Sequence, residues 1–409
     1  MESIRRRLFR AAGLLALAVP LFGLPASAQQ LEGKVIRIGA IVPSSGPFAE
    51  WGRANTVTLR MLEKEVNESG GINGAKLEIV IYDDAAQPAQ AANSLRKLAG
   101  DDNVLAVAGP LTSSACEVTF PVANQMGIVA MSQASSKPGV AANNRPWAFR
   151  NTVDEAILAK ESVPYLIDNY DVKSVAVIYD AKDAVSTAIA TAIMPAKMKE
   201  HGVKVLNEGS YLSFNTGDLD VSAQVTSIAA MNPDAVVIGA DYSEAITVIR
   251  EMRRQGFVKP VIGGTPLISS AILRAAPDIP IIAPATFYAS MEGEKAQAFI
   301  AKLHPLLRET SGLPDSIEPS MYDANIYENV SMFIEAVKNG GVTGEPDRVS
   351  EDRVKVREYL ERMDGFEGLG GLIRFNENGD AIKTFYIVLG QNGKWTTKIR
   401  ACSSPDGKC

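Results

Sequence analysis

Hydroxyl-bearing residues gather in three loops of the first half of the sequence, each next to a short apolar run. The loops are "PSSGPFAEW" (43–51), "GPLTSSA" (109–115) and "QASSKPG" (133–139). Hydroxyls and the free N–H groups at a helix start form a good receptor for a carboxylate, and a large aromatic beside them can pack on the rest of a ligand. The alternative is that these hydroxyls only cap helices. The candidate ligand residues are Trp51, Thr112, Ser113, Ser114, Ser135 and Ser136.

The second half of the sequence offers carboxylates and a phenol at the corresponding positions. The loops "YDAKDAVS" (179–186), "GADYSEA" (239–245) and "GGTPLI" (263–268) also lie at the ends of apolar runs. Aspartate or tyrosine there could receive an amine, a hydroxyl or an amide of a ligand, whereas an N-cap role is the competing interpretation for both aspartates. The candidates are Asp183, Asp241, Tyr242 and Thr265.

The elements that must position these loops alternate regularly. β-branched apolar runs of strand length are followed by small-residue turns and by amphipathic stretches of helical length. Continuous apolar runs are typical of strands covered by helices on both faces, so the pattern predicts an α/β fold with parallel sheets. Ligands of such sheets bind outside the carboxyl ends of the strands, where the six loops lie. The predicted strands are 34–42, 76–83, 104–109, 127–132, 173–180, 203–209, 234–240 and 260–264, and the predicted helices include 52–69, 89–99, 114–126, 154–169, 184–201, 219–232 and 243–255.

The chain length indicates two lobes, because 409 residues exceed one typical core. "RPWAFRNTVDEA" (145–156) and "IPIIAPATFYAS" (279–290) interrupt the alternation and predict crossovers between the lobes. Two Asn-Gly pairs within 371–395 predict an antiparallel hairpin. We expect hinge motion near residues 150, 286 and 366. The predicted lobes are 34–150 plus 287–365 and 151–286 plus 366–401, followed by a tail at 402–409.

The first 28 residues predict a secretory signal peptide, because a basic start and a short apolar stretch precede small residues up to Ala28. Sec export is the expectation, and a partial twin-arginine pattern in the basic start keeps the other route open. We therefore expect a soluble protein of the periplasm. In that oxidising compartment Cys402 and Cys409 would close a turn-rich loop as a disulfide, and two exposed thiols are the alternative.

Composition and motifs argue against several other classes. A formal charge of −6 and a pI of about 5.3 do not suit a nucleic-acid groove. His201 and His304 are the two histidines, and both fall in predicted helices away from the loops. The sequence has no metal-ligand spacing, dinucleotide fingerprint or nucleophile elbow. We therefore expect no catalysis, no metal and no cofactor, and an exported hydrolase is the least favoured alternative.

Three segments of the sequence resemble a known family. "IRIGAIVPSSGPFAEWG", "ESGGINGAKLEIVIYDDAAQPAQAANSLRKL" and "GGLIRFNENGDAIKTFYIVLGQNGKW" are similar, in this order, to the periplasmic substrate-binding proteins of branched-chain amino acid type ABC importers. The likeness covers nearly all of residues 34–400. It implies a type I periplasmic binding protein fold, in which two α/β lobes joined by three crossovers close around a small ligand. It also implies delivery to a membrane permease by a protein that is not itself membrane-inserted and that we expect to be a monomer. Presentation of the ligand to a separate sensory receptor is the alternative.

The resemblance implies roles for individual residues. Trp51 corresponds to the aromatic that packs on the ligand. The loop that holds the ligand's α-carboxylate corresponds to 112–114, with Ser113 as the best match, and the second ligand loop corresponds to 135–136.

The ammonium side of the site departs from the family pattern, since Ala184 stands where the family has tyrosine and Thr265 where it has an acid. An ammonium in a closed cleft without a carboxylate partner is costly. Three ligand classes therefore stay open: an aromatic acid without an α-amine, a hydrophobic amino acid held through Asp241 or Asp183, and an amide, urea-like or dicarboxylate ligand. Arg150 is a candidate cation for a dicarboxylate, and a solvated surface charge is the alternative.

Overall fold

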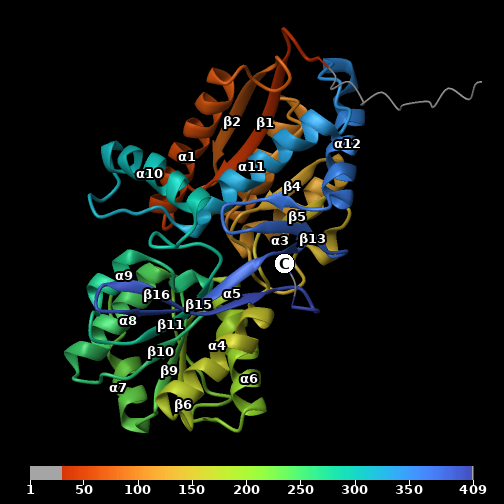
Figure 1. The fold of residues 1–409 in the computed structure, drawn as a ribbon. Helices are drawn as coiled ribbons and strands as arrows, with labels where there is room; N and C mark the ends of the chain where they lie inside the picture. Colours follow the sequence, from red (N-terminus) through yellow and green to blue (C-terminus); the bar gives the residue numbers. More distant parts are fainter. Residues whose placement is uncertain (1–29, 408) are drawn as a thin grey trace, which may run out of the picture.

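The structure is a computed structural model that describes residues 30–407 and 409, so the predicted signal peptide lies outside the described residues. Two helix-covered sheets lie one above the other in Figure 1. The predicted two-lobed α/β architecture with parallel sheets is confirmed. We call the five-stranded sheet with its helices lobe 1, and the eight-stranded sheet with its helices lobe 2.

Lobe 1 is built on five parallel strands in the order β2-β1-β3-β4-β5. The strands are β1 (Val35–Val42), β2 (Lys76–Asp83), β3 (Ala106–Ala108), β4 (Val129–Ser132) and β5 (Ala148–Arg150), and the helices are α1 (Ala49–Glu68), α2 (Pro88–Gly100), α3 (Ser113–Met126), α10 (Glu294–Glu309), α11 (Met321–Asn339) and α12 (Val349–Arg362), with 3₁₀ turns at Ala142–Asn144 and Pro346–Arg348. Ile38 of β1 packs with α1, α11 and α12, and Ile41 of the same strand packs with α2 and α3 on the other face. Burial on both faces explains the continuous apolar run of β1.

Lobe 2 is built on a sheet in the order β16-β15-β11-β10-β9-β6-β7, with β8 beside β6. The strands are β6 (Ser174–Asp180), β7 (Lys204–Val205), β8 (Leu212–Phe214), β9 (Ala235–Gly239), β10 (Val261–Ile262), β11 (Ile281–Ala285), β15 (Thr384–Gln391) and β16 (Lys394–Cys402), and the helices are α4 (Glu155–Tyr170), α5 (Ala184–Ala188), α6 (Met194–Glu200), α7 (Ser222–Met231), α8 (Tyr242–Arg254) and α9 (Ser270–Ala275), with a π-helical turn at Ile189–Ile193 and a 3₁₀ turn at Thr265–Leu267. Helices α4, α5 and α6 cover one face, and α7, α8 and α9 cover the other. Strands β15 and β16 are antiparallel to each other, and β15 is antiparallel to β11.

The chain passes between the lobes after β5, after β11 and again before β15. The third passage differs from the expected position near residue 366. Strands β12 (Phe366–Glu367), β13 (Leu372–Phe375) and β14 (Ala381–Ile382) form a small sheet whose Ile373 and Ala381 belong to the lobe 1 core. We therefore propose that the third hinge lies near Lys383, and that lobe 1 extends to residue 382.

The two Asn-Gly pairs form two hairpins rather than the single predicted one. The first pair includes Gly379 and joins β13 to β14, whereas the second includes Gly393 and joins β15 to β16. Both glycines have positive φ, at 75° and 76°, as tight hairpin turns require. The segment between the hairpins is the third passage, so one hairpin belongs to each lobe.

Buried charges tie the passages to lobe 1. Arg150, a candidate ligand cation, has a fully buried side chain that pairs with Asp154 at 2.9 Å and with Asp380. Lys383 is also buried, and its Nζ lies 2.9 Å from Glu328 of α11. Because its charge is already paired with the carboxylates of Asp154 and Asp380, Arg150 has a structural role at the first passage.

The C-terminal tail carries the predicted disulfide, between Cys402 and Cys409. The remaining cysteine, Cys116, is buried and unpaired, and burial raises the pKa of its thiol to about 12. In the part of the chain that the structure describes, no helix is long and apolar enough to span a bilayer.

Candidate functional site

An aromatic cluster lies between the lobes and is centred on Trp51. This residue stands in the first turn of α1, directly after the loop that follows β1, and only 6% of it is exposed. Its ring centroid lies 4.3 Å from that of Tyr322 of α11 and 5.1 Å from that of Tyr242 of α8. The Phe48 ring stacks on it at 5.7 Å. Trp51 therefore contacts rings from both lobes.

The hydroxyl loops of lobe 1 meet beside this cluster. Thr112 is the N-cap of α3, and its Oγ1 accepts a hydrogen bond from a backbone N–H of the first turn at 3.2 Å. The hydroxyls of Ser113 and Ser135 lie 2.9 Å apart. Ser114 reaches across to lobe 2, where its hydroxyl accepts a 3.4 Å hydrogen bond from the Ala184 backbone.

Two carboxylates of lobe 2 stand opposite these hydroxyls at helix N-termini. Asp183 caps α5 and Asp241 caps α8, with backbone N–H donors at 2.9 Å and 3.2 Å. Burial, and then the neighbouring Glu244, raise the pKa of Asp241 well above its usual value, and burial also raises the pKa of Asp183. Neither carboxylate forms an ion pair within residues 30–407. Both are caps, yet both are also available to a cation.

One interlobe cavity brings together candidates from the two halves of the sequence. Trp51, Thr112 and Ser113 line it from lobe 1, and Asp183 and Asp241 line it from lobe 2. The rest of its wall consists of Phe48, Leu111, Ala134, Val185, Pro266 and Tyr322. Hydroxyls and a helix start at one side, carboxylates at the other and aromatic rings between them can hold a small zwitterion.

The other predicted residues lie around this cavity rather than on its wall. Ser135 is linked to the cavity by its hydrogen bond to Ser113, and Tyr242 is linked to it by its contact with the ring of Trp51. Ser114 lines a neighbouring groove. Ser136 and Thr265 were candidates for direct ligand contact, but they bond to each other at 3.3 Å and to a buried glutamate.

That glutamate, Glu155, is a site residue that the sequence analysis missed. It begins α4, is fully buried, and accepts hydrogen bonds from the hydroxyls of Ser136 and Thr265 and from the Thr265 N–H. Its second oxygen, Oε2, has no partner among the described residues and lies against Gly264, where a Cβ would be only 2.7 Å away. Burial raises the pKa of Glu155 to about 7. Glu155 therefore links the lobes behind the ligand cavity.

Tyr322 was also missed, although the sequence contains a signal for it. Ser320 and Asp323 form a capping box at the start of α11, and Tyr322 lies inside that first turn. Burial raises the pKa of Tyr322 well above its usual value, and the carboxylates of Asp241, Glu155 and Asp183 add to this effect. A capping box before an apolar run marks a helix start.

Among residues 30–407 and 409, no cluster of acids, histidines or cysteines has the geometry of a metal site.

Comparisons with known proteins agree with this architecture. Residues 35–394 match the family model for periplasmic binding proteins. The chain is 34% identical to an amino acid binding protein of Pseudomonas aeruginosa, over 61% of this chain and 65% of that protein. It is 28% identical to the Leu/Ile/Val-binding protein homolog 1 of Brucella abortus, over 96% of this chain and 99% of that protein.

Solved structures share the fold over most of the chain. The branched-chain amino acid transporter substrate binding protein LivJ of Streptococcus pneumoniae, in complex with isoleucine, aligns with a TM-score of 0.75 at 25% identity, over 90% of this chain and 100% of that one. A solute binding protein of an ABC transporter from R. palustris, in complex with benzoate, aligns with a TM-score of 0.75 at 16% identity, over 91% of this chain and 97% of that one. The chain therefore belongs to the periplasmic binding protein family, of the kind that serves branched-chain amino acid type ABC importers.

Proposed function

We propose that the protein captures an α-amino acid between its two lobes and delivers it to the membrane permease of an ABC importer. The observation that carries this proposal is the placement of two carboxylates, the half-buried Asp183 and the buried Asp241, in one cavity with Thr112 and Ser113. The hydroxyls and the start of α3 would hold the ligand's carboxylate, and the two acids would hold its ammonium. The ligand's side chain would then pack on Trp51.

Desolvation makes these acids selective for a cation. A carboxylate that is removed from water without a counter-ion is destabilised in its charged form. Burial accordingly raises the pKa of both Asp183 and Asp241. An ammonium beside them favours the charged carboxylates. Where these acids are protonated in the ligand-free closed form, binding therefore releases a proton. A ligand that lacks the amine leaves the charged form of these carboxylates destabilised.

Closure follows from contacts with both lobes. A ligand that touches Ser113 and Asp241 together binds the closed form more tightly than the open one, and this difference sets how far it shifts the population. Rotation would occur at the three passages, where the chain leaves one lobe for the other. We further propose that residues 1–28 direct export, so that a monomer acts in the periplasm.

One observation favours a second ligand class. Trp51 and Phe48 stack with only 8° between their planes, which suits a flat ring. If Asp183 and Asp241 stay protonated in the complex, the cavity is neutral and would accept an aromatic acid through the hydroxyls alone.

Matched ligand pairs separate the two classes. Calorimetric titration of refolded, ligand-free protein should compare phenylalanine with 3-phenylpropanoate, and leucine with 4-methylpentanoate, since each pair differs only by the amine. We expect the amino acids to bind, and Asp241→Asn to weaken them about 100-fold. Asp168→Asn, at an exposed acid on α4, is the control. Equal binding of both members of each pair, unaffected by Asp241→Asn, would refute the amino acid assignment and support the aromatic acid.

A further inference from the structure

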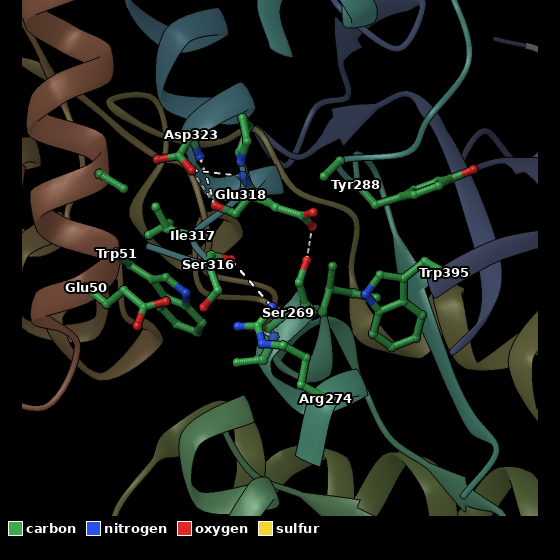
Figure 2. A pocket seen from close by; sticks show the side chains of 17 residues that line it. Glu50, Trp51, Ser269, Arg274, Tyr288, Ser316, Ile317, Glu318, Asp323 and Trp395 are labelled. Atoms are coloured by element: carbon green, nitrogen blue, oxygen red, sulfur yellow. Dashed lines mark hydrogen bonds between the residues drawn. The ribbon is translucent and has the colours of Figure 1, made fainter. Parts of the chain in front are cut away.

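A second cavity lies at the junction of the lobes, beside Trp51. Figure 2 shows it between α1, the segment before α11, the start of α9 and the strand that carries Trp395. Lobe 1 contributes Glu50 and Glu318, and lobe 2 contributes Arg274 and Trp395. Trp51 borders this cavity as well as the ligand cavity. The indole of Trp51 is therefore the wall that the two cavities share.

The second cavity contains a buried hydrogen-bond donor without an acceptor. Trp395 is 6% exposed, and its Nε1 has no partner among the described residues. The opposite edge of the ring packs on Gly390, where a Cβ would lie 2.6 Å from Cζ3. This packing fixes the ring, and Figure 2 shows its nitrogen edge turned toward the cavity. A buried N–H without an acceptor is costly, and a ligand oxygen would remove that cost.

Two of the acids of the cavity already have donors. Glu318 accepts from the Ser270 hydroxyl, and Glu50 lies near the hydroxyl of Tyr242, whose pKa is raised first by burial and then by the carboxylates of Asp241 and Glu50. Asp323 accepts from Asn55 at 2.9 Å as well as from its capping partner Ser320. Glu318 and Asp323 are thus hydrogen-bonded from within the protein.

A second donor, the guanidinium of Arg274, lies at the rim of the cavity and forms few interactions within the protein. The guanidinium of Arg274 makes one long hydrogen bond, of 3.4 Å, to the backbone oxygen of Ser316, and no ion pair of Arg274 occurs among residues 30–407 and 409. Its Nη1 belongs to lobe 2 and Ser316 belongs to lobe 1, so the contact crosses the junction. The buried indole N–H of Trp395 and the exposed guanidinium of Arg274 are both donors, which call for an acceptor oxygen.

We infer that the second cavity is a compartment of the ligand cleft that receives an oxygen at the far end of the ligand's side chain. This inference rests on the proposed amino acid function and names the ligand class more closely: an amino acid whose side chain runs along Trp51 and ends in a carboxamide or a carboxylate. The N–H of Trp395 bonds to that oxygen, and Arg274 adds a charge contact where the group is a carboxylate.

The test uses side chains of similar length with different ends. Leucine, glutamine and glutamate are titrated into refolded wild-type protein, Trp395→Phe and Arg274→Gln, with Trp147→Phe as the control, because Trp147 packs under Arg357 in lobe 1. We expect Trp395→Phe to weaken glutamine and glutamate about tenfold and to leave leucine unchanged, since the lost N–H serves only a ligand oxygen. Arg274→Gln should weaken glutamate alone. Thermal melting checks that each variant folds.

Results that would contradict this inference differ from results that would contradict the proposed amino acid function. Binding of leucine without binding of either glutamine or glutamate would overturn the inference and leave the amino acid function intact. An equal loss for all three ligands in Trp395→Phe would overturn it too, because the indole would then act only through packing. Absence of binding for every amino acid, with binding of aromatic acids, would remove the proposed function itself.

Discussion

The ring of Trp51 in lobe 1 lies 5.1 Å from the ring of Tyr242 in lobe 2, with 43° between their planes. This contact joins α1 to α8 across the cleft, so it forms only when the lobes are together. The same indole borders the ligand cavity. Closure of the lobes and contact with the ligand are therefore coupled through one side chain.

The first prediction concerns this coupling. Trp51→Ala removes the ring that both the ligand and Tyr242 contact, so we expect the affinity for the ligand to fall about 100-fold, as for a central interface anchor. Calorimetric titration with the ligand of highest affinity measures it. Trp147→Ala, at a half-buried tryptophan outside the cleft, should leave the affinity within about twofold. An unchanged affinity in Trp51→Ala would exclude a direct ligand contact.

The sequence carried enough information to place Trp51 and Ser113, since both follow strands of a parallel sheet and such loops must meet at one edge. It also offered ligand contact and capping as rival roles for Asp183 and Asp241. The structure shows that both aspartates cap helices and line the cavity, so the two roles are compatible.

The sequence could not place residues whose position depends on long-range packing. Glu155 lies close to the first passage in the sequence, and only the approach of Ser136 and Thr265 from different lobes makes it part of the site. The hinge expected near residue 366 and the one proposed near Lys383 differ for a similar reason. Strand β13 has the alternation of an edge hairpin, and that pattern does not reveal which of two cores will bury Ile373.

The second prediction concerns pH. The pKa of Glu155 is raised from 4.5 to about 7, because burial outweighs its three hydrogen bonds. The folded protein therefore holds a proton that the unfolded chain loses between these values, so this contribution to stability is complete below pH 4.5 and is lost as the pH rises through 7. The loss is about 3 kcal/mol.

Glu155→Gln keeps the shape of the side chain and removes its titration. Urea denaturation from pH 5 to pH 8 should show the variant gaining stability relative to wild type, by up to about 3 kcal/mol. Glu161→Gln, at a partly buried acid of the same helix, should track wild type at every pH. Parallel curves for Glu155→Gln and wild type would show that Glu155 is ionised throughout.

The third prediction concerns the passage before β15. Lys383 donates to Glu328, Asn151 and Asn325 at 2.9, 3.0 and 3.1 Å. Lys383→Met leaves the Glu328 carboxylate buried without its cation, so we expect a loss of about 3–5 kcal/mol in the free energy of unfolding. Adding Glu328→Gln removes the unpaired charge and should restore much of that loss. If the two substitutions instead lower the stability additively in urea denaturation, the charge pair is not the source of the effect.

The last prediction concerns the C-terminal disulfide. Ser403 follows Cys402, and its N–H and hydroxyl bond to the backbone of Lys383 at 3.1 and 3.0 Å, so the closed loop is fixed to the third passage. Replacing both disulfide cysteines by serine frees the end of the chain, and a loop this short should cost about 2 kcal/mol of stability. Thermal melting of the double variant should match that of wild type in reductant, because the buried thiol of Cys116 is not exchanged. The cavity lies elsewhere, so the ligand affinity should stay within about twofold. A fall in affinity on reduction would mean that the tail acts on the hinge itself, through Lys383.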